Sequence, residues 1–495
     1  MHRRPGVAPA KLSSSPFCNI PDFCLSHDCF ILCPHLKPTT KNKLKKKNYS
    51  SKAAWLAGAA ALAAFTTRSH AQSSDALIDK LVDKGILTQT EAKDLREEAD
   101  KNFATAVAAK TGMPDWVTGY KISGDVRGRW ENFRSPNSLF AERNRLRYRL
   151  RAGMVISMTD NFEAGFRLTS SDAASGGANN EGDALSGNTT FQNNGSKKLV
   201  FIDQAYGRWT PFNGPFAGGF TGGKMENPFV VSDLVIDPDY TPEGLAAQFA
   251  YQLNNVHSLK LNAGGFMLDE ISQNESDPWL LGVQARLDST WNAKWSSTVG
   301  AAFLPMVSRS SLTNGAVPNQ QRGNTRNGAT GALAYQFDPI VADASVTYLL
   351  DSAPLYTGPF PVKVGGDFIY NPGAPDAADN YAWSAGVTFG KSGKRKTWEL
   401  SYTYRLLGAN AMWEELTDSD FGAFYAAANS PANSGAGIGY GAGPNTRGHV
   451  VKFAYSFSDS FTLSAKWFGT DLIHAFPASS DSDMSRLQLD AMWKF

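Results

Sequence analysis

Five arginines recur at every second position between residues 143 and 151 and alternate with other side chains. In an extended strand, side chains at every second position lie on the same face. The sequence therefore predicts one row of guanidinium groups, formed by Arg143, Arg145, Arg147, Arg149 and Arg151. Such a row can bind anions, because each guanidinium presents a planar fork of charged hydrogen-bond donors.

Further charged residues share this phase on the segments before and after the row. The cations are Arg127, Arg129 and Arg167, and the carboxylates are Asp125, Glu131 and Glu163. If these arginines line a water-filled channel, they favour the passage of anions. Alternatively, they pair with carboxylates on adjacent strands and only stiffen the wall. The sequence leaves both interpretations open.

The arginine row belongs to a region in which apolar and polar residues alternate, from about Val117 to the end of the chain. The clearest alternating segments are 146–156, 344–350, 398–406, 451–457, 461–467 and 487–495. A strand that crosses a bilayer needs about 9–11 residues, and lipid forces such strands to close into a barrel. Residues 117–495 are therefore predicted to form a transmembrane antiparallel β-barrel, an all-β fold, in the bacterial outer membrane.

The connections between these segments fall into two length classes. Short ones are predicted at 159–161, 254–256, 338–339, 391–396 and 458–460, and long ones at 171–198, 226–243, 305–326 and 409–446. Short periplasmic turns and long outer loops are typical of outer-membrane barrels, which have even strand numbers. The count is sixteen if residues 362–370 are a loop excursion and eighteen if they are a strand. We favour sixteen, which leaves an aqueous channel.

The loop at 409–446 carries a cluster of acidic residues, Glu414, Glu415, Asp418 and Asp420. One interpretation is that the loop folds into the lumen, where these carboxylates face the arginine row and create a transverse field. The other is that it forms a solvated surface loop.

The first 71 residues read as processing signals rather than as a domain. A basic stretch, the apolar run 53–65 and Ser69-His70-Ala71 have the order of a secretory signal peptide, 45–71. Cleavage is expected between Ala71 and Gln72. Residues 1–44 are interpreted as preceding the true start codon near Leu44. They contain all four cysteines, whose spacing fits no zinc pattern.

Residues 72–114 have helical rather than strand periodicity. Gly85 fits a helix C-terminal cap, Thr88 to Glu91 forms a capping box, and Pro114 ends the region. We predict a short periplasmic α-helical segment that contacts one partner surface.

Charge and composition exclude several classes of function for the mature chain. Residues 1–71 hold 11 of the 48 basic and 2 of the 46 acidic residues, so the mature chain has a net charge of −7. The basic balance of the whole chain is therefore no sign of nucleic-acid binding. The mature chain has no cysteine, and its three histidines, His257, His449 and His474, are far apart. We find no hydrolase or phosphate-loop motif and predict no enzyme, cofactor or metal site.

Several short motifs resemble one known family in their order. They are 81–88 (LVDKGILT), 224–229 (KMENPF), 398–405 (WELSYTYR), 418–421 (DSDF) and 447–449 (RGH). Together they resemble the putative porin family of Gram-negative outer membranes and, more distantly, the phosphate-selective porins O and P. The resemblance covers most of residues 74–495. It implies a passive diffusion channel with a periplasmic helical segment and supplies no catalytic residue.

The sequence thus predicts a porin for small hydrophilic solutes with an anion preference. The expected pore-lining residues are Arg127, Arg129, Arg145, Arg147, Arg149, Arg151 and Arg167. The alternative is a structural protein that tethers the outer membrane to peptidoglycan through residues 74–110. Expected partners are outer-membrane lipid, a homotrimer by resemblance to other porins, and the barrel-assembly machinery, which would read the terminal Phe495.

Overall fold

The computed structural model describes residues 113–173, 181–272, 275–312, 322–327, 331–427 and 438–495. The chain divides into two units, residues 1–96 and 97–495. The predicted signal peptide, its predicted cleavage site at Ala71 and Gln72, and the predicted helical segment up to residue 112 lie outside the described residues. No helix in the described part of the chain is long and apolar enough to cross a membrane.

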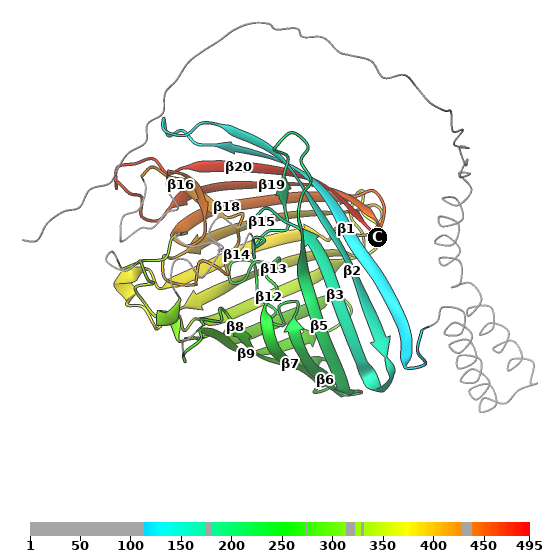
Figure 1. Ribbon diagram of the computed structural model, residues 1–495. Helices are drawn as coiled ribbons and strands as arrows, with labels where there is room; N and C mark the ends of the chain where they lie inside the picture. The colour runs from blue at the N-terminus through cyan, green and yellow to red at the C-terminus, as the bar shows by residue number, and fades with distance from the viewer. Residues whose placement is uncertain (1–112, 174–180, 273–274, 313–321, 328–330, 428–437) are drawn as a thin grey trace, which may run out of the picture. The chain divides into compact units, whose positions relative to one another are not determined.

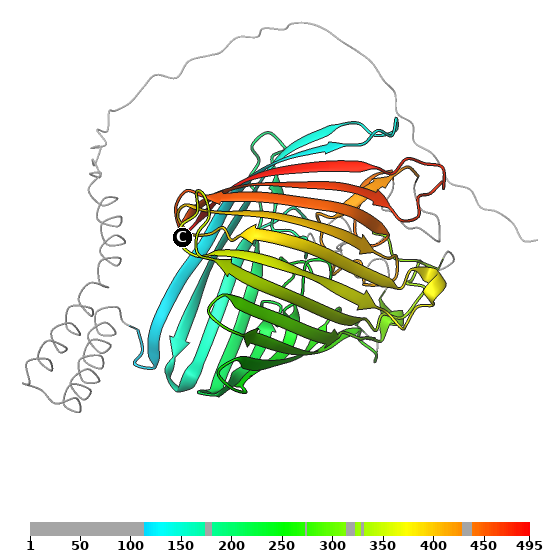
Figure 2. The same cartoon turned by 180° about the vertical axis from the view of Figure 1, so that it is seen from behind.

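Sixteen long strands, each antiparallel to its neighbours, form the wall of the second unit in the described residues (Figures 1 and 2). They are β1 (Val117–Arg134), β2 (Arg143–Met158), β3 (Phe162–Ser170), β5 (Val200–Phe212), β6 (Phe216–Lys224), β7 (Glu243–Gln252), β8 (His257–Met267), β9 (Trp279–Thr290), β10 (Trp295–Phe303), β12 (Ile340–Leu350), β13 (Phe360–Tyr370), β14 (Tyr381–Gly390), β15 (Thr397–Leu407), β18 (Thr446–Ser456), β19 (Phe461–Leu472) and β20 (Met484–Lys494). The predicted count of sixteen is confirmed.

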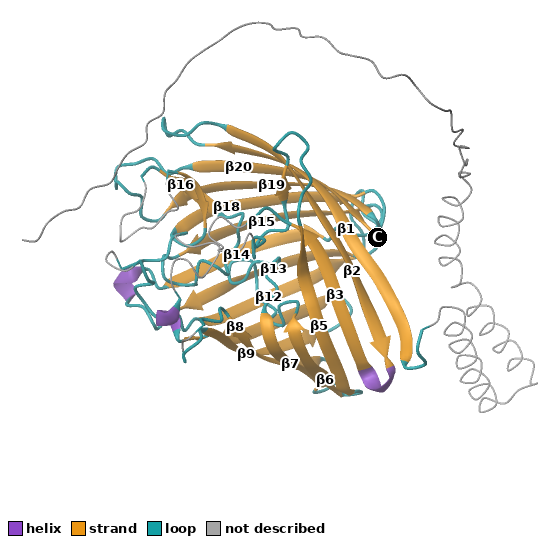
Figure 3. Ribbon diagram, in the orientation of Figure 1, coloured by secondary structure: helices purple, strands orange, loops and turns teal. Residues whose placement is uncertain are grey.

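The remaining elements are short and lie in the connections (Figure 3). They are β4 (Thr189–Thr190), β11 (Met306–Val307), the hairpin β16 (Gly422–Tyr425) and β17 (Gly439–Ala442), and the 3₁₀ turns η1 (Thr159–Asn161), η2 (Arg309–Ser311) and η3 (Asp376–Ala378). We number the connections at the loop end L1 to L8. Four of them enter the argument below: L2 (171–199), L3 (225–242), L5 (304–339) and L7 (408–445).

The barrel closes where β1 pairs with β20, from Asp125 opposite Lys494 to Arg134 opposite Ser485. Phe495 extends this seam, because it exchanges backbone hydrogen bonds with Gly124 at 2.9 and 3.1 Å. A Cβ on Gly124 would lie 2.4 Å from the Phe495 ring, so only glycine lets the ring approach this closely. The terminal aromatic is therefore part of the closed wall.

The two faces of the wall differ as the alternation predicts. Outward-facing side chains such as Leu146, Phe166 and Val283 are 45–56% exposed, as a lipid-facing surface requires. Aromatic pairs such as Phe461 and Trp493, whose ring centroids are 4.9 Å apart, lie at the turn end. On the inner face, polar residues occupy the turn-end half of the strands, and on β1, β2 and β20 they extend into the loop-end half, as Arg129, Arg147 and Arg486 show.

Two of the predicted connections are wrong, although the strand count is right. Residues 362–370 are not a loop excursion: they belong to β13, which pairs with β12 and β14 along its length. Residues 338–339 are not a turn either, because they end L5 and lead into β12. The nine-residue connection 351–359 is the turn between β12 and β13, and it restores the regular alternation of short and long connections.

The main apolar core lies inside the barrel, at the loop end. Inner-face residues of eight strands contribute to it, namely Phe266, Leu280, Ala302, Val341, Ile369, Leu407, Val450 and Phe468. They pack against loop residues, including Leu234, Leu304 and Trp413. The inner face of these eight strands is thus apolar at the loop end, whereas the arginine row keeps the inner face of β2 polar there.

Candidate functional site

Loop L3 crosses the interior of the barrel and contacts three separate parts of the wall. On β9, the Gln284 side chain exchanges two 2.9 Å hydrogen bonds with the backbone of Val230. On β15, Arg405 donates to Asp233 at 2.6 Å. On β2, Arg149 donates to Asp239 at 3.3 Å. Because these strands lie apart around the barrel, L3 spans the lumen.

Loop L7 packs onto L3 and holds it in place. The amide of Asp237 donates to the carbonyl of Leu416 at 2.7 Å, and the amide of Ser419 donates to the Asp237 carboxylate at 2.9 Å. Val235 and Leu416 are fully buried in the same apolar cluster. The interpretation that 409–446 folds into the lumen is therefore confirmed for residues 409–425, and the solvated alternative is wrong there.

Loop L5 completes this structure by binding the start of L7. Glu414 pairs with Arg326 and accepts a 2.6 Å hydrogen bond from the amide of Arg322. The Asn324 side chain donates to the carbonyls of Ala409 and Met412 at 2.8 and 2.9 Å. We call the described parts of L3, L5 and L7 the loop plug, since their apolar and polar contacts join them into one body inside the barrel.

The arginine row lies on the inner face of β2, and four of its members have carboxylate partners. Arg145 pairs with Glu131, and Arg147 reaches Asp172 at 3.5 Å. Arg149 pairs with Asp125 at 2.8 Å on β1. Asp239 of L3 lies between Arg149 and Arg151 and pairs with both. No carboxylate in the described part of the chain lies within ion-pair distance of Arg143, which is exposed.

The other three predicted arginines are paired as well. Arg129 forms a bidentate contact with Asp490, at 2.7 and 2.8 Å, and reaches Asp420 of L7 at 3.1 Å. Arg127 lies 4.0 Å from Asp490, and Arg167 pairs with Asp203. Asp418 and Asp420 therefore do not face the row across open water, as the transverse-field interpretation requires. Instead, Asp420 pairs directly with Arg129 and Arg486, and Asp418 pairs with Arg405 at 2.8 Å.

Two cavities lie along the arginine row, one on each side of Asp239. The outer cavity, of about 440 Å³, is lined by Arg143, Arg145, Arg147, Arg322 and Arg486, with Asp183 and Asp420 as its only acidic lining residues among those described. The inner cavity, of about 460 Å³, is lined by Arg151, Arg167, Glu226 and Asp233 among others. The outer cavity thus has a net positive lining, and the inner one is balanced.

A third cavity lies on the far side of L3. It has a volume of about 270 Å³ and is lined by L3 residues 230–233 and by strands β9 to β15. Its charged residues are Arg286, Lys363 and Arg405 together with Asp233, Asp343 and Asp367. Because Val231 and Asp233 line both this cavity and the inner cavity, L3 separates the two.

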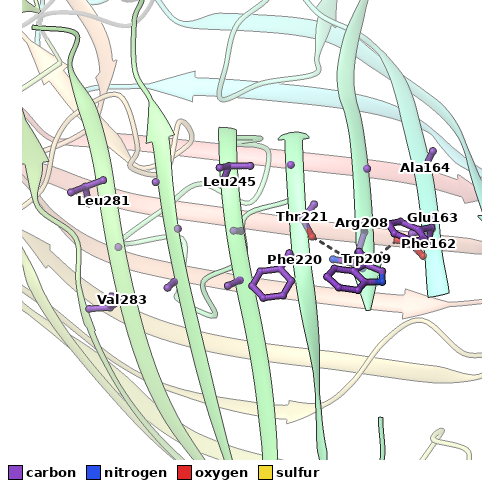
Figure 4. A pocket seen from close by; sticks show the side chains of 18 of the residues that line it. Phe162, Glu163, Ala164, Arg208, Trp209, Phe220, Thr221, Leu245, Leu281 and Val283 are labelled. Atoms are coloured by element: carbon purple, nitrogen blue, oxygen red, sulfur yellow. Dashed lines mark hydrogen bonds and ion pairs between the residues drawn. The ribbon is translucent and has the colours of Figure 1, made fainter. Parts of the chain in front are cut away.

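A further cavity, larger than the three above, lies on the outer, lipid-facing side of the wall (Figure 4). Its volume is about 1070 Å³, and large side chains such as Phe162, Trp209, Phe220, Leu245 and Leu281 surround it. Small residues on the same strands create the depression, namely Ala164, Gly207, Gly222, Ala247, Ala263 and Gly265. Because the lining is overwhelmingly apolar, this cavity suits lipid and not a hydrophilic solute.

The contact between L3 and L7 carries two carboxyl groups with opposite pKa shifts. Burial and the nearby Asp239 and Asp418 raise the pKa of Asp237 well above its usual range. Burial also opposes ionisation of Asp239, but Arg151 and Arg149 outweigh it and lower its pKa. Asp237 therefore stabilises the contact while protonated, and Asp239 stabilises it while ionised.

We expect the plug to loosen at both ends of the pH range. The contribution of Asp237 is complete below its unfolded pKa of about 3.9 and is lost as the pH rises through its raised folded pKa. That of Asp239 is lost as the pH falls through its lowered folded pKa. Hydrogen exchange of residues 233–241, corrected for intrinsic rates, should accelerate at high pH, and Asp237→Asn should remove this acceleration. An unchanged high-pH response in that variant would assign it to another group.

The three histidines lie in separate parts of the barrel: His257 on β8, His449 on β18 and His474 in the connection after β19. His449 contacts the hydroxyl of Tyr402 at 2.9 Å, on the outer face of the wall. The serine nearest in sequence to Tyr402, Ser401, lies on the other face of the wall and opposite Lys452. No group of three His, Cys, Asp or Glu residues in the described part of the chain could hold a metal ion.

Several site residues were not predicted from the sequence. They are the arginine Arg486 and the carboxylates Asp239, Asp490, Asp203 and Asp172. Arg486 alternates in phase with Gln488 and Asp490 on the last strand, a signal that was available. The signal for Asp239 was weaker. The apolar run Leu234-Val235-Ile236 lies just before it in a long connection, and such a run indicates that this part of the loop is buried.

Part of the chain is similar to a known family. Residues 136–308 match the model of a family described as putative porin. No curated protein matches the chain. Similar solved structures include OprB of Pseudomonas putida (9% identity, 76% of this chain and 94% of that one, TM-score 0.44) and the outer-membrane channel DcaP of Acinetobacter baumannii (11%, 76% and 97%, 0.41). The match agrees with the predicted resemblance over residues 136–308, and together with the apolar outer face of the closed barrel it supports a channel of the bacterial outer membrane.

Proposed function

We propose that this outer-membrane channel passes small hydrophilic solutes by passive diffusion and prefers anions. One observation carries the preference: five arginines and two carboxylates line the outer cavity, where a solute enters. Arg143 is exposed there and has no carboxylate partner in the described residues, so an incoming anion can pair with it without displacing another group. Rings of arginine favour anions in this way.

The loop plug limits the size of the solute. A sixteen-stranded barrel leaves a wide aqueous channel when its lumen is empty. Here L3 spans that lumen, and the two described cavities that L3 lines have volumes of about 270 and 460 Å³. We infer that small ions and metabolites pass beside L3, whereas larger sugars are retarded.

The preference is tested by the reversal potential of purified protein in planar bilayers under a salt gradient. We expect wild type to have the sign of an anion-selective channel, and Arg143→Gln to reduce the potential, because the substitution removes a charge without leaving a carboxylate unpaired. Lys197→Gln in L2, which changes the same charge at an exposed site away from the outer cavity, should have little effect. A cation-selective wild type, or equal shifts in the two variants, would refute the proposal.

The seam at Phe495 provides a test of assembly, in which the barrel-assembly machinery is the proposed partner. Deleting Phe495 removes both hydrogen bonds to Gly124 and the ring that covers it. We expect less folded barrel in the outer membrane, measured by heat-modifiable gel mobility, whereas the conductance of the assembled fraction should be nearly unchanged. Phe495→Tyr, which keeps the ring, should assemble normally. Normal levels after deletion would contradict this role.

The other predicted partners remain proposals. The peptidoglycan tether depends on residues 74–110, which lie outside the described residues. A homotrimer is compatible with the small-residue depression on the outer wall, because small side chains allow close approach in lipid. Sedimentation in detergent measures the oligomeric state directly.

A further inference from the structure

The turn between β14 and β15, residues 391–396, differs in charge from every other turn at its end of the barrel. It contains the cations Lys391, Lys394, Arg395 and Lys396 within six residues. The other six turns there are 159–161, 213–215, 253–256, 291–294, 351–359 and 457–460. Together they contain one cation, Lys294, and three carboxylates, Asp160, Asp351 and Asp459. Lys294 is paired with Asp351 at 2.8 Å, so positive charge is concentrated at one place on this rim.

The backbone of this basic turn is held by its neighbours on both sides. Towards β18, the amide of Lys396 donates to the carbonyl of Ser456 at 2.8 Å, and that of Arg395 donates to the Asp459 carboxylate at 2.7 Å. Towards the 351–359 turn, the Tyr356 hydroxyl donates to the carbonyl of Lys391 at 3.2 Å. The turn therefore presents its side chains from a fixed position.

The four cationic side chains themselves are exposed. Within the described residues, none of them lies within ion-pair distance of a carboxylate. The Asp459 carboxylate does contact the turn, but it accepts a hydrogen bond from the backbone amide of Arg395 and does not pair with the Arg395 guanidinium. A fixed backbone with four unpaired cations is an arrangement prepared for an external anion.

Apolar side chains flank the basic turn on both sides. Leu355, in the 351–359 turn, is 83% exposed, and Phe457, beside Ser456, is 52% exposed. Below them lies an aromatic cluster in which the Phe360 ring is 4.8 Å from that of Trp398 and 4.9 Å from that of Tyr356. Aromatic clusters of this kind mark the level of the lipid headgroups.

We propose that residues 391–396 bind the phosphate headgroup of an anionic phospholipid in the periplasmic leaflet. Charge alone would suit any phosphate, but the exposed Leu355 and Phe457 select a ligand that carries acyl chains beside its phosphate. A soluble phosphate or a polar cell-wall polymer would leave both side chains in water. Lysine and arginine next to a membrane interface bind anionic lipids, and each strengthens the binding by roughly fivefold.

The test uses the full-length mature barrel in phosphatidylcholine vesicles that contain trace spin-labelled phosphatidylglycerol or phosphatidylcholine. Electron paramagnetic resonance reports how much of each lipid is immobilised at the protein. We expect wild type to retain phosphatidylglycerol several-fold more than phosphatidylcholine, and high salt to reduce the difference. Lys394→Gln/Arg395→Gln should lower the preference by roughly fivefold or more. A wild type without a preference overturns the proposal.

The matched control is Lys197→Gln/Lys198→Gln, which removes the same charge in L2, at the opposite end of the barrel. It should leave the lipid preference unchanged, and an equal loss in both double variants would show that only net charge matters. Leu355→Ser keeps every cation and should weaken retention of the lipid. Inorganic phosphate is the competing ligand. If millimolar phosphate lowers the lipid preference of wild type as much as the double substitution does, the site binds free phosphate and the lipid assignment is wrong. Heat-modifiable mobility confirms that each variant is folded.

Discussion

Replacing Asp239 with asparagine is expected to raise the anion-to-cation permeability ratio of the channel. Asp239 is the carboxylate of L3 that lies between Arg149 and Arg151 and pairs with both. Without its charge, Arg151 loses its acidic partner in the described residues and Arg149 keeps only Asp125. Asparagine retains a side-chain oxygen for the two guanidinium groups, but it weakens this one contact. L3 should still stay in place near neutral pH, because Val230 remains bonded to Gln284 and Asp233 to Arg405.

The size of this effect follows from one charge at close range. The interaction energy of two unit charges 4 Å apart is about 1 kcal/mol in water, and it is larger in a narrow lumen. That energy corresponds to a change of roughly fivefold in the permeability ratio at low salt. The shift should shrink as the salt concentration rises, because ions in the channel screen the arginines.

Asp237→Asn is the matched control for this experiment. It lies two residues away on the same loop and is also isosteric, but Asp237 touches the amides of Ser419 and Asp239 rather than an arginine. Burial and its acidic neighbours raise its pKa, so this substitution removes less negative charge than Asp239→Asn does. Equal shifts in the two variants would show that loop movement, not charge, sets selectivity.

The same experiment separates the role of Asp239 from the proposed function. If wild type is cation-selective, the anion preference is wrong, yet Asp239→Asn should still move the reversal potential in the anion direction. If wild type prefers anions and the variant does not differ from it, Asp239 has no role and the outer cavity alone sets the preference.

The barrel was predictable because its signals are local. Alternation, strand length and the sorting of connections each depend on residues close together in sequence, and they gave the fold, sixteen strands and the phase of the arginine row. Residues 362–370 were misassigned for an equally physical reason. Ile369 faces inward and is fully buried against the loop core, so β13 has apolar residues on both faces near its end.

The partners of the arginines could be predicted only in part. Asp125 and Glu131 lie on the strand next to the row and follow from register. Asp239 reaches the row from a loop about ninety residues further along the chain, and Asp420 reaches Arg129 on the adjacent strand from 291 residues away. Periodicity does not encode either contact. The sequence therefore showed where the cations lie but not how far the loops neutralise them.

Placing a charge in the plug should open the channel, and Val235→Asp is the sharpest such change. Val235 is fully buried in the apolar cluster that joins L3, L5 and L7, and burying an unpaired carboxylate there costs several kcal/mol. The new group would also lie near Asp233 and Asp237 on the same loop. Because the strands remain hydrogen-bonded around the closed wall, the cost falls on the loop contact rather than on the barrel.

We therefore expect a several-fold rise in single-channel conductance and a loss of discrimination against larger sugars in Val235→Asp. Limited proteolysis should cut L3 in this variant and not in wild type, while heat-modifiable mobility stays normal. Val235→Ala, which makes only a small cavity in the same cluster, should keep conductance close to wild type. If Val235→Asp folds, resists proteolysis in L3 and conducts like wild type, the plug does not limit the pore, and the constriction must lie elsewhere along the wall.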